Sequence, residues 1–270
     1  MINLKAVTKS FAGTRVLGPI DMLIPAGRTT VLLGPSGCGK STLLRLMIGL
    51  IEPDAGTVEF ERHAVTDENV LATRRKMGYV IQEGGLFPHL TARRNVTLVA
   101  RHLRGCRNSR RRQPTVRRSS NDDPGAAWDD REIERKVAEL AELTQLPSDA
   151  LDRYPVQLSG GQRQRVSLMR ALMLDPYVLL FDEPLGALDP MIRAGLQADL
   201  KRIFQTLKKT VVLVTHDIGE AGFFSDRIVL LREGLIVQHG TLRDLVRSPS
   251  NPFVTRFINA QRSPLEMLES

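Results

Sequence analysis

Residues 34–42 read GPSGCGKST, in which three glycines precede a lysine and two hydroxyl side chains. Glycines let backbone N–H groups close around phosphate oxygens, and the tip of a following helix adds partial positive charge. At this spacing Lys40 would reach the β- and γ-phosphates of a nucleotide, Ser41 would ligate Mg²⁺ and Thr42 would lie against the α-phosphate. The predicted nucleotide-binding residues are Gly34, Pro35, Ser36, Gly37, Cys38, Gly39, Lys40, Ser41 and Thr42.

Cys38 lies inside this loop, so we expect its alkylation to block nucleotide binding by bulk. The alternative is a shielded, inert thiol.

A pair of carboxylates follows the apolar run VLLF at 178–181. Asp182 would emerge at the C-terminal end of a strand, where α/β sheets place their ligands, and would hold Mg²⁺ through water. Glu183 would point to a different side of the strand end. It is a candidate for polarising an attacking water, and the alternative is a solvated carboxylate.

A second glycine-rich stretch, LSGGQ at 158–162, opens a predicted helix with Ser159 as its N-cap. The tip of that helix offers N–H groups, a hydroxyl and the positive end of a dipole, which together suit an anion. Two copies arranged head to tail would let one nucleotide use both glycine-rich sites. The residues expected to contact the nucleotide of the other copy are Ser159, Gly160, Gly161 and Gln162.

Alternating strands and helices must position these loops. Apolar runs predict strands, and apolar residues at helical spacing predict helices. Such alternation implies an α/β fold with a largely parallel sheet and helices on both faces. The predicted strands are 2–7, 16–24, 29–34, 78–82, 177–184 and 210–217, with a hairpin at 226–240 and helices near 40–50, 133–146 and 191–207.

Composition excludes several classes of protein. The 270 residues are 42% hydrophobic and 25% charged, which is ordinary for a globular chain with a sizeable core. The net charge of +8 comes almost wholly from residues 104–120, which hold seven arginines and no acid, so the fold itself is not a basic nucleic-acid surface. No apolar run reaches the length of a membrane span, and we expect no signal peptide and no disulfide framework.

Six motifs occur together and in order: the Lys40 loop, Gln82 after YVI, LSGGQ, LLFDEP at 179–184, GALD at 186–189 and VTHD at 214–217. With this set the chain resembles the ATP-binding subunit of an ABC transporter, over essentially its whole length apart from 104–125. The resemblance implies a P-loop NTPase cassette with a mostly parallel sheet core, an antiparallel β subdomain and an inserted α-helical subdomain. It implies one ABC ATPase domain over 1–262, with a core of about 1–90 and 176–240, a helical subdomain of about 91–175, and a C-terminal helix and tail at 241–270.

The resemblance also implies roles for residues beyond the two glycine loops. Phe11 would stack on adenine, although the family more often has tyrosine at this position. Gln82 would contact Mg²⁺ and the attacking water, Glu183 would act as general base and His216 would contact the γ-phosphate. Asp189 would act across the dimer interface, and the Mg²⁺ ligands would be Ser41, Gln82 and Asp182.

The expected cofactors are ATP and Mg²⁺, and the expected activity is ATP hydrolysis that closes and opens a dimer. The expected partners are a second copy of the chain, transmembrane permease subunits and, indirectly, an extracytoplasmic substrate-binding protein, at the cytoplasmic face of the inner membrane. No nucleic-acid partner is expected.

The stretch 74–103, with YVIQ…GLFPHLT, is similar to ATPases of quaternary-amine importers for glycine betaine, choline and carnitine, and it would line the face that docks the permease. The alternatives are an importer of an amino acid or organic anion, an exporter, or an ABC ATPase of nucleic-acid metabolism.

Two departures from the family stand out. Many quaternary-amine ATPases carry a C-terminal nucleotide-sensing module, which we expect to be absent because the chain stops at Ser270. The Arg-rich insertion at 104–125 is expected to be exposed. It is either a variable solvated loop or a contact for anionic lipid through 104–118.

Overall fold

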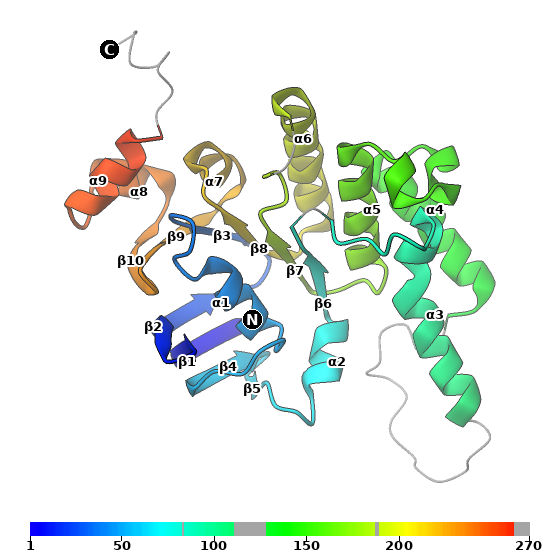
Figure 1. Cartoon of the computed structure of the whole chain (residues 1–270), viewed down its shortest axis with the longest axis horizontal. Helices are drawn as coiled ribbons and strands as arrows, with labels where there is room; N and C mark the ends of the chain where they lie inside the picture. The colour runs from blue at the N-terminus through cyan, green and yellow to red at the C-terminus, as the bar shows by residue number, and fades with distance from the viewer. Residues whose placement is uncertain (83, 111–127, 187–188, 262–270) are drawn as a thin grey trace. The chain divides into compact units, whose positions relative to one another are not determined.

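A computed structural model describes residues 1–82, 84–110, 128–186 and 189–261 (Figure 1). The chain divides into two compact units. The first is made of Met1–Thr66 and the chain from Lys208 onward, and the second of Asp67–Leu207.

The first unit contains two groups of paired strands. One is a four-stranded antiparallel sheet in the order β2-β1-β4-β5. In the other, the central strand β3 pairs in parallel with β8 on one side and β9 on the other, and β9 forms the predicted hairpin with β10. All five residues of β3 and all six of β8 are buried, as expected of strands covered on both faces. The strands are β1 (Ile2–Phe11), β2 (Thr14–Ile24), β3 (Thr29–Leu33), β4 (Ala55–Phe60), β5 (His63–Ala64), β8 (Thr210–Thr215), β9 (Arg227–Arg232) and β10 (Leu235–Gly240).

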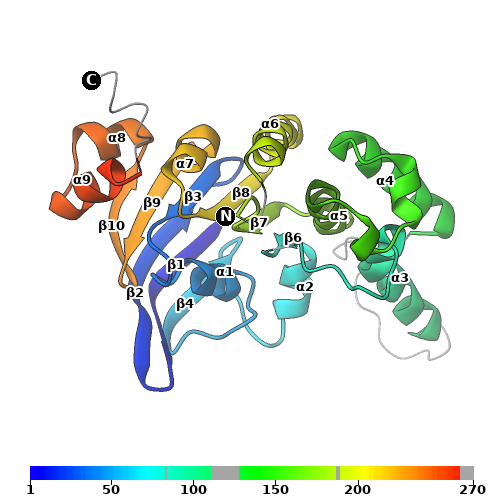
Figure 2. The same cartoon turned by 45° about the horizontal axis from the view of Figure 1, so that its top comes forward.

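Helices α1 (Lys40–Met47) and α7 (Ile218–Phe224) follow β3 and β8 directly and pack within the same unit. Where the sequence predicts one C-terminal helix, the structure has two, α8 (Leu242–Arg247) and α9 (Pro252–Asn259), which lie together beside β10 (Figure 2). Prolines 249 and 252 separate them, and Thr241 and Asn251 cap them.

The second unit pairs β6 (Met77–Val80) in parallel with β7 (Val178–Asp182). Helix α5 packs against α3, α4, α6 and β6 and is therefore the centre of the helical part. The predicted helix at 133–146 is confirmed as α4, which begins slightly earlier because Asp129 and Glu132 form a capping box. The helices are α2 (Val70–Arg75), α3 (Ala92–Arg110), α4 (Asp130–Thr144), α5 (Gly160–Leu172) and α6 (Pro190–Leu207), with short 3₁₀ turns at Ser148–Asp152 and Pro155–Gln157.

Helix α3 runs to Arg110, so the first part of the predicted 104–125 insertion is helical. The rest of the insertion lies outside the described residues, as do Ala187 and Leu188 of the GALD motif and the tail from 262 onward. Within the described ranges no helix combines the length and the hydropathy needed to cross a bilayer.

Candidate nucleotide-binding site

The loop after β3 adopts a shape that only glycine allows at two of its positions. Gly34 has φ +153, and a Cβ there would lie 2.3 Å from the Leu231 carbonyl oxygen. Gly39 has φ +102, and a Cβ there would lie 2.5 Å from the Leu17 side chain. Gly39 is also the N-cap of α1, where no side chain caps the helix. The loop therefore packs closely against residues of β2 and β9 and ends at an uncapped helix tip, which fits the cradle expected for phosphate.

Lys40 is the first residue of α1 and is only 4% exposed. Its ammonium group donates hydrogen bonds of 2.8 Å to the carbonyl oxygens of Gly34 and Pro35. The lysine therefore ties the start of the loop to the helix that follows it. The positive charge of Lys40 therefore lies inside the loop, where it can attract an anion.

Cys38 is buried beside Lys40, with its Sγ 3.9 Å from the ammonium nitrogen. Burial raises the pKa of the Cys38 thiol, and the neighbouring Lys40 charge offsets part of that rise. The structure therefore favours the shielded, weakly reactive thiol over the accessible one.

The register of the parallel strands places His216 near this loop. Leu33 at the end of β3 pairs with Thr215 at the end of β8, so Gly34 and His216 are the next residues at the same edge. His216 is exposed. The turn that carries it is fixed by Thr215, whose hydroxyl donates to Glu220 at 2.6 Å and accepts from the backbone N–H of Asp217.

Phe11 lies in the same unit, at the end of β1. Its ring is 46% exposed, and the Lys9 ammonium lies 5.6 Å from the ring centroid. An exposed ring of this kind can stack on a planar base.

The second unit brings the predicted carboxylates and Gln82 to one edge. Val80 pairs with Phe181 in the β6–β7 ladder, so Gln82 and Asp182–Glu183 leave their strands side by side. Asp182 is 5% exposed and accepts a 3.2 Å hydrogen bond from the hydroxyl of Tyr79, a contact that the sequence did not predict. Glu183 has φ +46, an unusual left-handed conformation that is often found at functional sites.

The predicted N-cap of α5 is confirmed. The Ser159 hydroxyl accepts from the Gln162 N–H at 3.2 Å, and the Gln162 side chain accepts from the Ser159 N–H at 3.0 Å. Gly161 faces α6, where a Cβ would lie 3.2 Å from the Ile192 side chain. Asp189 caps the start of α6 by accepting from the N–H groups of Met191 and Ile192 at 3.1 and 3.0 Å.

The arginines of α5 fix this helix to its surroundings, another feature that sequence reasoning missed. Arg163 donates to the Leu158 carbonyl at 2.7 Å, and Arg165 donates to Asp199 of α6 at 2.5 Å. Arg170 donates to the carbonyl groups of Gly84 and Gly85. The QRQR pattern at 162–165 contains Arg163 and Arg165, whereas Arg170 lies outside it.

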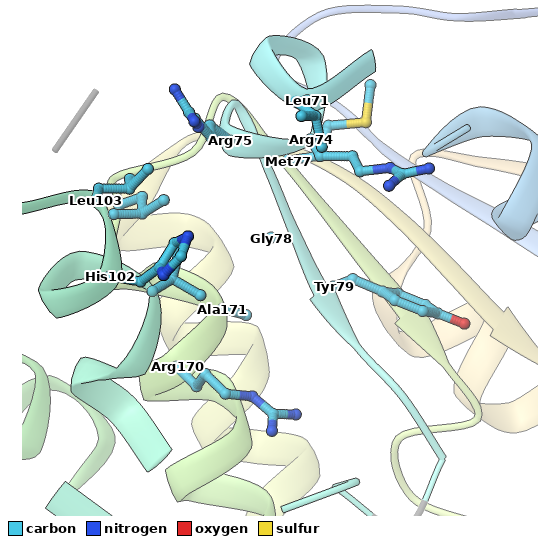
Figure 3. Close-up of a pocket in the computed structure, with 12 residues that line it drawn as sticks. Leu71, Arg74, Arg75, Met77, Gly78, Tyr79, His102, Leu103, Arg170 and Ala171 are labelled. Carbon is cyan, nitrogen blue, oxygen red and sulfur yellow. The ribbon is translucent and has the colours of Figure 1, made fainter. Parts of the chain in front are cut away.

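A cavity of about 390 Å³ opens between α2, β6, α3 and α5 within the second unit (Figure 3). Its apolar lining includes Leu71, Met77 and Leu103. Basic side chains from two elements, Arg75 and Arg170, also line it.

The family model described as "ABC transporter" matches residues 17–186. The chain belongs to the ABC transporter family. The P-loop ABC fold predicted from the sequence is thereby confirmed, and a solved structure supports it. That structure, of the ATP-binding cassette MJ0796 in a dimeric post-hydrolysis state bound to ADP and Pi, has a TM-score of 0.74 and 32% identity, over 90% of this chain and 99% of that one.

Two relatives within the ABC family are similar over nearly the whole chain. The choline transport ATP-binding protein OpuBA of Bacillus subtilis is 39% identical over 263 residues, which are 97% of this chain and 63% of that protein. The sulfate/thiosulfate import ATP-binding protein CysA of Pectobacterium atrosepticum is 41% identical over 258 residues, 95% of this chain and 71% of that protein. The chain thus spans less than two thirds of the length of OpuBA.

Proposed function

We propose that the chain hydrolyses ATP and thereby powers an ABC importer. The observation that carries this proposal is the loop of residues 34–40, whose glycine-dependent backbone and buried Lys40 suit a triphosphate. Family membership and the resemblance to an ADP-bound cassette support it.

The oxygen donors of the proposed metal site are those that Mg²⁺ prefers: the Ser41 hydroxyl, the Gln82 amide and the Asp182 carboxylate. The bound ion would neutralise charge on the β- and γ-phosphates. Lys40 would hold those phosphates, and Phe11 would stack on the adenine.

Glu183 is proposed to accept a proton from the attacking water. The water oxygen bonds to the γ-phosphorus as the bond between that phosphorus and the oxygen bridging to the β-phosphate breaks. Gln82 would orient that water and His216 would hold the γ-phosphate. Positioning and charge neutralisation are then the main sources of catalysis.

The nucleotide is proposed to lie between two copies, with Ser159–Gln162 and Asp189 of one copy facing the phosphate loop of the other. Apolar side chains support an interface here, since Met191, two residues after Asp189, is 87% exposed and Ile192 is 39% exposed. ATP would hold the closed dimer together, and hydrolysis would release it.

Residues 74–103 are proposed to dock a membrane permease, which would hold the protein peripherally at the cytoplasmic face of the membrane. The cavity in Figure 3 supports this, because its apolar lining and its arginines suit an amphipathic segment with an acidic side chain. A substrate-binding protein would act only through that permease.

The proposed cargo is a quaternary amine of the choline or glycine betaine type. The motif YVIQ…GLFPHLT and the similarity to a choline transport protein over 97% of the chain support it. A second candidate is an anion importer, because the similarity to a sulfate importer ATPase is as high in identity.

The decisive experiment measures phosphate release by the purified chain with ATP and Mg²⁺, and the molar mass of Glu183→Gln with and without ATP. We expect hydrolysis by the wild type and an ATP-dependent dimer of the variant, whereas Glu139→Gln on the exposed face of α4 should behave as wild type. Absence of hydrolysis, or a monomeric Glu183→Gln at saturating ATP, would contradict the proposal.

The cargo is tested separately. The chain is reconstituted with its permease and substrate-binding protein, and ATPase stimulation by choline, glycine betaine and sulfate is compared. Stimulation by sulfate alone would reject the quaternary amine.

The Arg-rich segment is proposed to contact anionic lipid through residues 104–118. Its seven arginines between 104 and 120 carry the charge for this contact. Deleting residues 104–122 should weaken association with anionic liposomes at low salt and leave ATPase activity intact. Unchanged liposome binding would reject the lipid contact.

A further inference from the structure

Arg170, near the end of α5, reaches the loop that follows Gln82. Its two terminal nitrogens donate to consecutive carbonyl groups, at 2.9 Å to Gly84 and 2.8 Å to Gly85. The same helix begins at Ser159. Two of the residues proposed to contact nucleotide from the second unit, Gln82 and Ser159, are therefore linked through one helix and one guanidinium group.

The backbone of this loop is shaped to lie on α5. Gly84 and Gly85 have φ values of +76 and +51. A Cβ on Gly85 would lie 1.9 Å from the Ile81 side chain, and a Cβ on Gly84 would lie 3.4 Å from the Arg163 carbonyl oxygen and 3.6 Å from Ser167 Cβ. Since residues 163, 167 and 170 share one face of a helix, the glycine pair rests on that face and the guanidinium holds it there.

The far end of the loop is anchored independently. Asn95 of α3 is fully buried and accepts from the Phe87 N–H at 2.8 Å. Its amide nitrogen donates to the carbonyl groups of Phe87, Leu90 and Thr91. Asn95 therefore fixes the side of the loop that leads into α3. On the side that carries Gln82, Arg170 holds the loop to α5.

Arginine suits this position better than lysine does. Its planar fork can donate to two neighbouring acceptors at once, whereas an ammonium group is a single point charge. Burial lowers the pKa of Arg170, yet arginine remains charged in proteins. Charged donors form stronger hydrogen bonds to carbonyl groups than neutral donors do, so this contact can hold a glycine-rich loop in place.

We propose that Arg170 is a positioning residue, which fixes the backbone after Gln82 to the helix that begins at Ser159. Gln82 and Ser159 then move as one body when the dimer closes. The catalytic consequence rests on the proposed ATPase function; the anchoring itself does not. Arg170 also lines the cavity between α2, β6, α3 and α5, so a segment bound there would touch the side chain that holds the loop.

The test is a double-mutant cycle with Arg170→Met and Gln82→Ala, together with hydrogen exchange of the amides at 84–86. Arg170→Met should lower kcat about tenfold and change the KM for ATP less than about twofold, because a misplaced group costs mainly turnover. In the Gln82→Ala background the same change should lower kcat less than about twofold. Exchange at 84–86 should accelerate, and Arg170→Lys should fall between Arg170→Met and the wild type.

Arg135→Met on the exposed face of α4 removes the same charge far from the loop in sequence and should leave exchange and kcat unchanged. Effects of Arg170→Met and Gln82→Ala that multiply, or unchanged exchange at 84–86, would overturn the proposal. A wild-type chain that hydrolyses no ATP would instead reject the proposed function. The exchange measurement would still decide whether Arg170 anchors the loop.

Discussion

The hydroxyl of Tyr79 on β6 donates a 3.2 Å hydrogen bond to Oδ2 of Asp182 at the end of β7. The bond crosses the parallel β6–β7 pair, and it joins a residue that lines the cavity to the carboxylate proposed to hold Mg²⁺. Partners of this kind orient a ligating carboxylate, and their loss commonly weakens metal binding.

Tyr79→Phe removes only this hydroxyl. We expect the Mg²⁺ concentration for half-maximal ATPase activity to rise about tenfold, as for other partners of metal ligands. The free energy of unfolding should fall by about 1.5 kcal/mol, since the lost bond is to a charged group. Tyr177→Phe is the matched control, because that ring is half-exposed and contacts Lys76. A Mg²⁺ dependence equal to that of the control would contradict the role of Tyr79.

Ser159 and Asp129 cap neighbouring helices with the same capping box, so their alanine variants form a matched pair. Each should lose about 1 kcal/mol of stability, measured by urea unfolding. Only Ser159→Ala should also weaken the ATP-dependent dimer, since only Ser159 is proposed to face nucleotide. Equal ATP-dependent dimerisation by the two variants would show that Ser159 only stabilises the start of α5 and does not contact nucleotide.

Lys40→Met should reduce ATP affinity at least about tenfold, because it removes the buried charge of the phosphate loop. The melting temperature should also fall, because the carbonyl groups of Gly34 and Pro35 lose the donor that Lys40 provides. Fluorescent-nucleotide titration and thermal melting measure the two effects. Lys5→Met, at an exposed surface pair with Glu59, serves as control. ATP affinity like that of Lys5→Met would exclude Lys40 from the phosphate site.

Cys38 should react slowly with maleimide. Its raised pKa lowers the thiolate fraction at neutral pH, and burial limits access. In Cys106→Ser, where Cys38 is the sole thiol, labelling of the native protein at pH 7 should be slower than labelling of the unfolded protein, because the raised pKa and burial act in the same direction. The native rate should then rise with pH.

The same shift predicts the sign of the pH dependence of stability. The folded state holds the Cys38 proton more tightly than the unfolded state does. The stabilisation from this protonated thiol is therefore present below the pKa of Cys38 in the unfolded chain, and it is lost as the pH rises through the pKa of Cys38 in the folded protein. Urea unfolding of Cys106→Ser between pH 7 and pH 10, compared with Cys38→Ser, measures it. In the maleimide experiment, rapid labelling of Cys38 in the folded protein at pH 7 would contradict its burial and show that the thiol is accessible.

Local features of the site were predictable because they depend on short spacings. The glycine loop before α1 and the Ser159 cap are both set by residues within a few positions of one another. The strands that carry them follow from uninterrupted apolar runs such as residues 29–33.

Features that depend on packing between distant segments were not predictable. The Tyr79–Asp182 bond requires the β6–β7 register, and the Arg170 contacts require the glycine loop to rest on α5. Gly34 lies so close to both Cys38 and Leu231 that a Cβ there would fall 2.9 Å from the Cys38 Sγ and 2.3 Å from the Leu231 carbonyl oxygen, and no local pattern near residue 38 encodes the approach of Leu231. The left-handed backbone of Glu183 is likewise set by its surroundings.

The two hydrogen bonds from Lys40 to Gly34 and Pro35 have a thermodynamic consequence for any anion that enters the loop. A flexible glycine-rich segment would lose much conformational entropy on binding and so weaken the complex. Here the ordering is already completed when the chain folds. If phosphate binds here as proposed, its affinity would depend less on ordering the loop than on the cost of removing water from the anion.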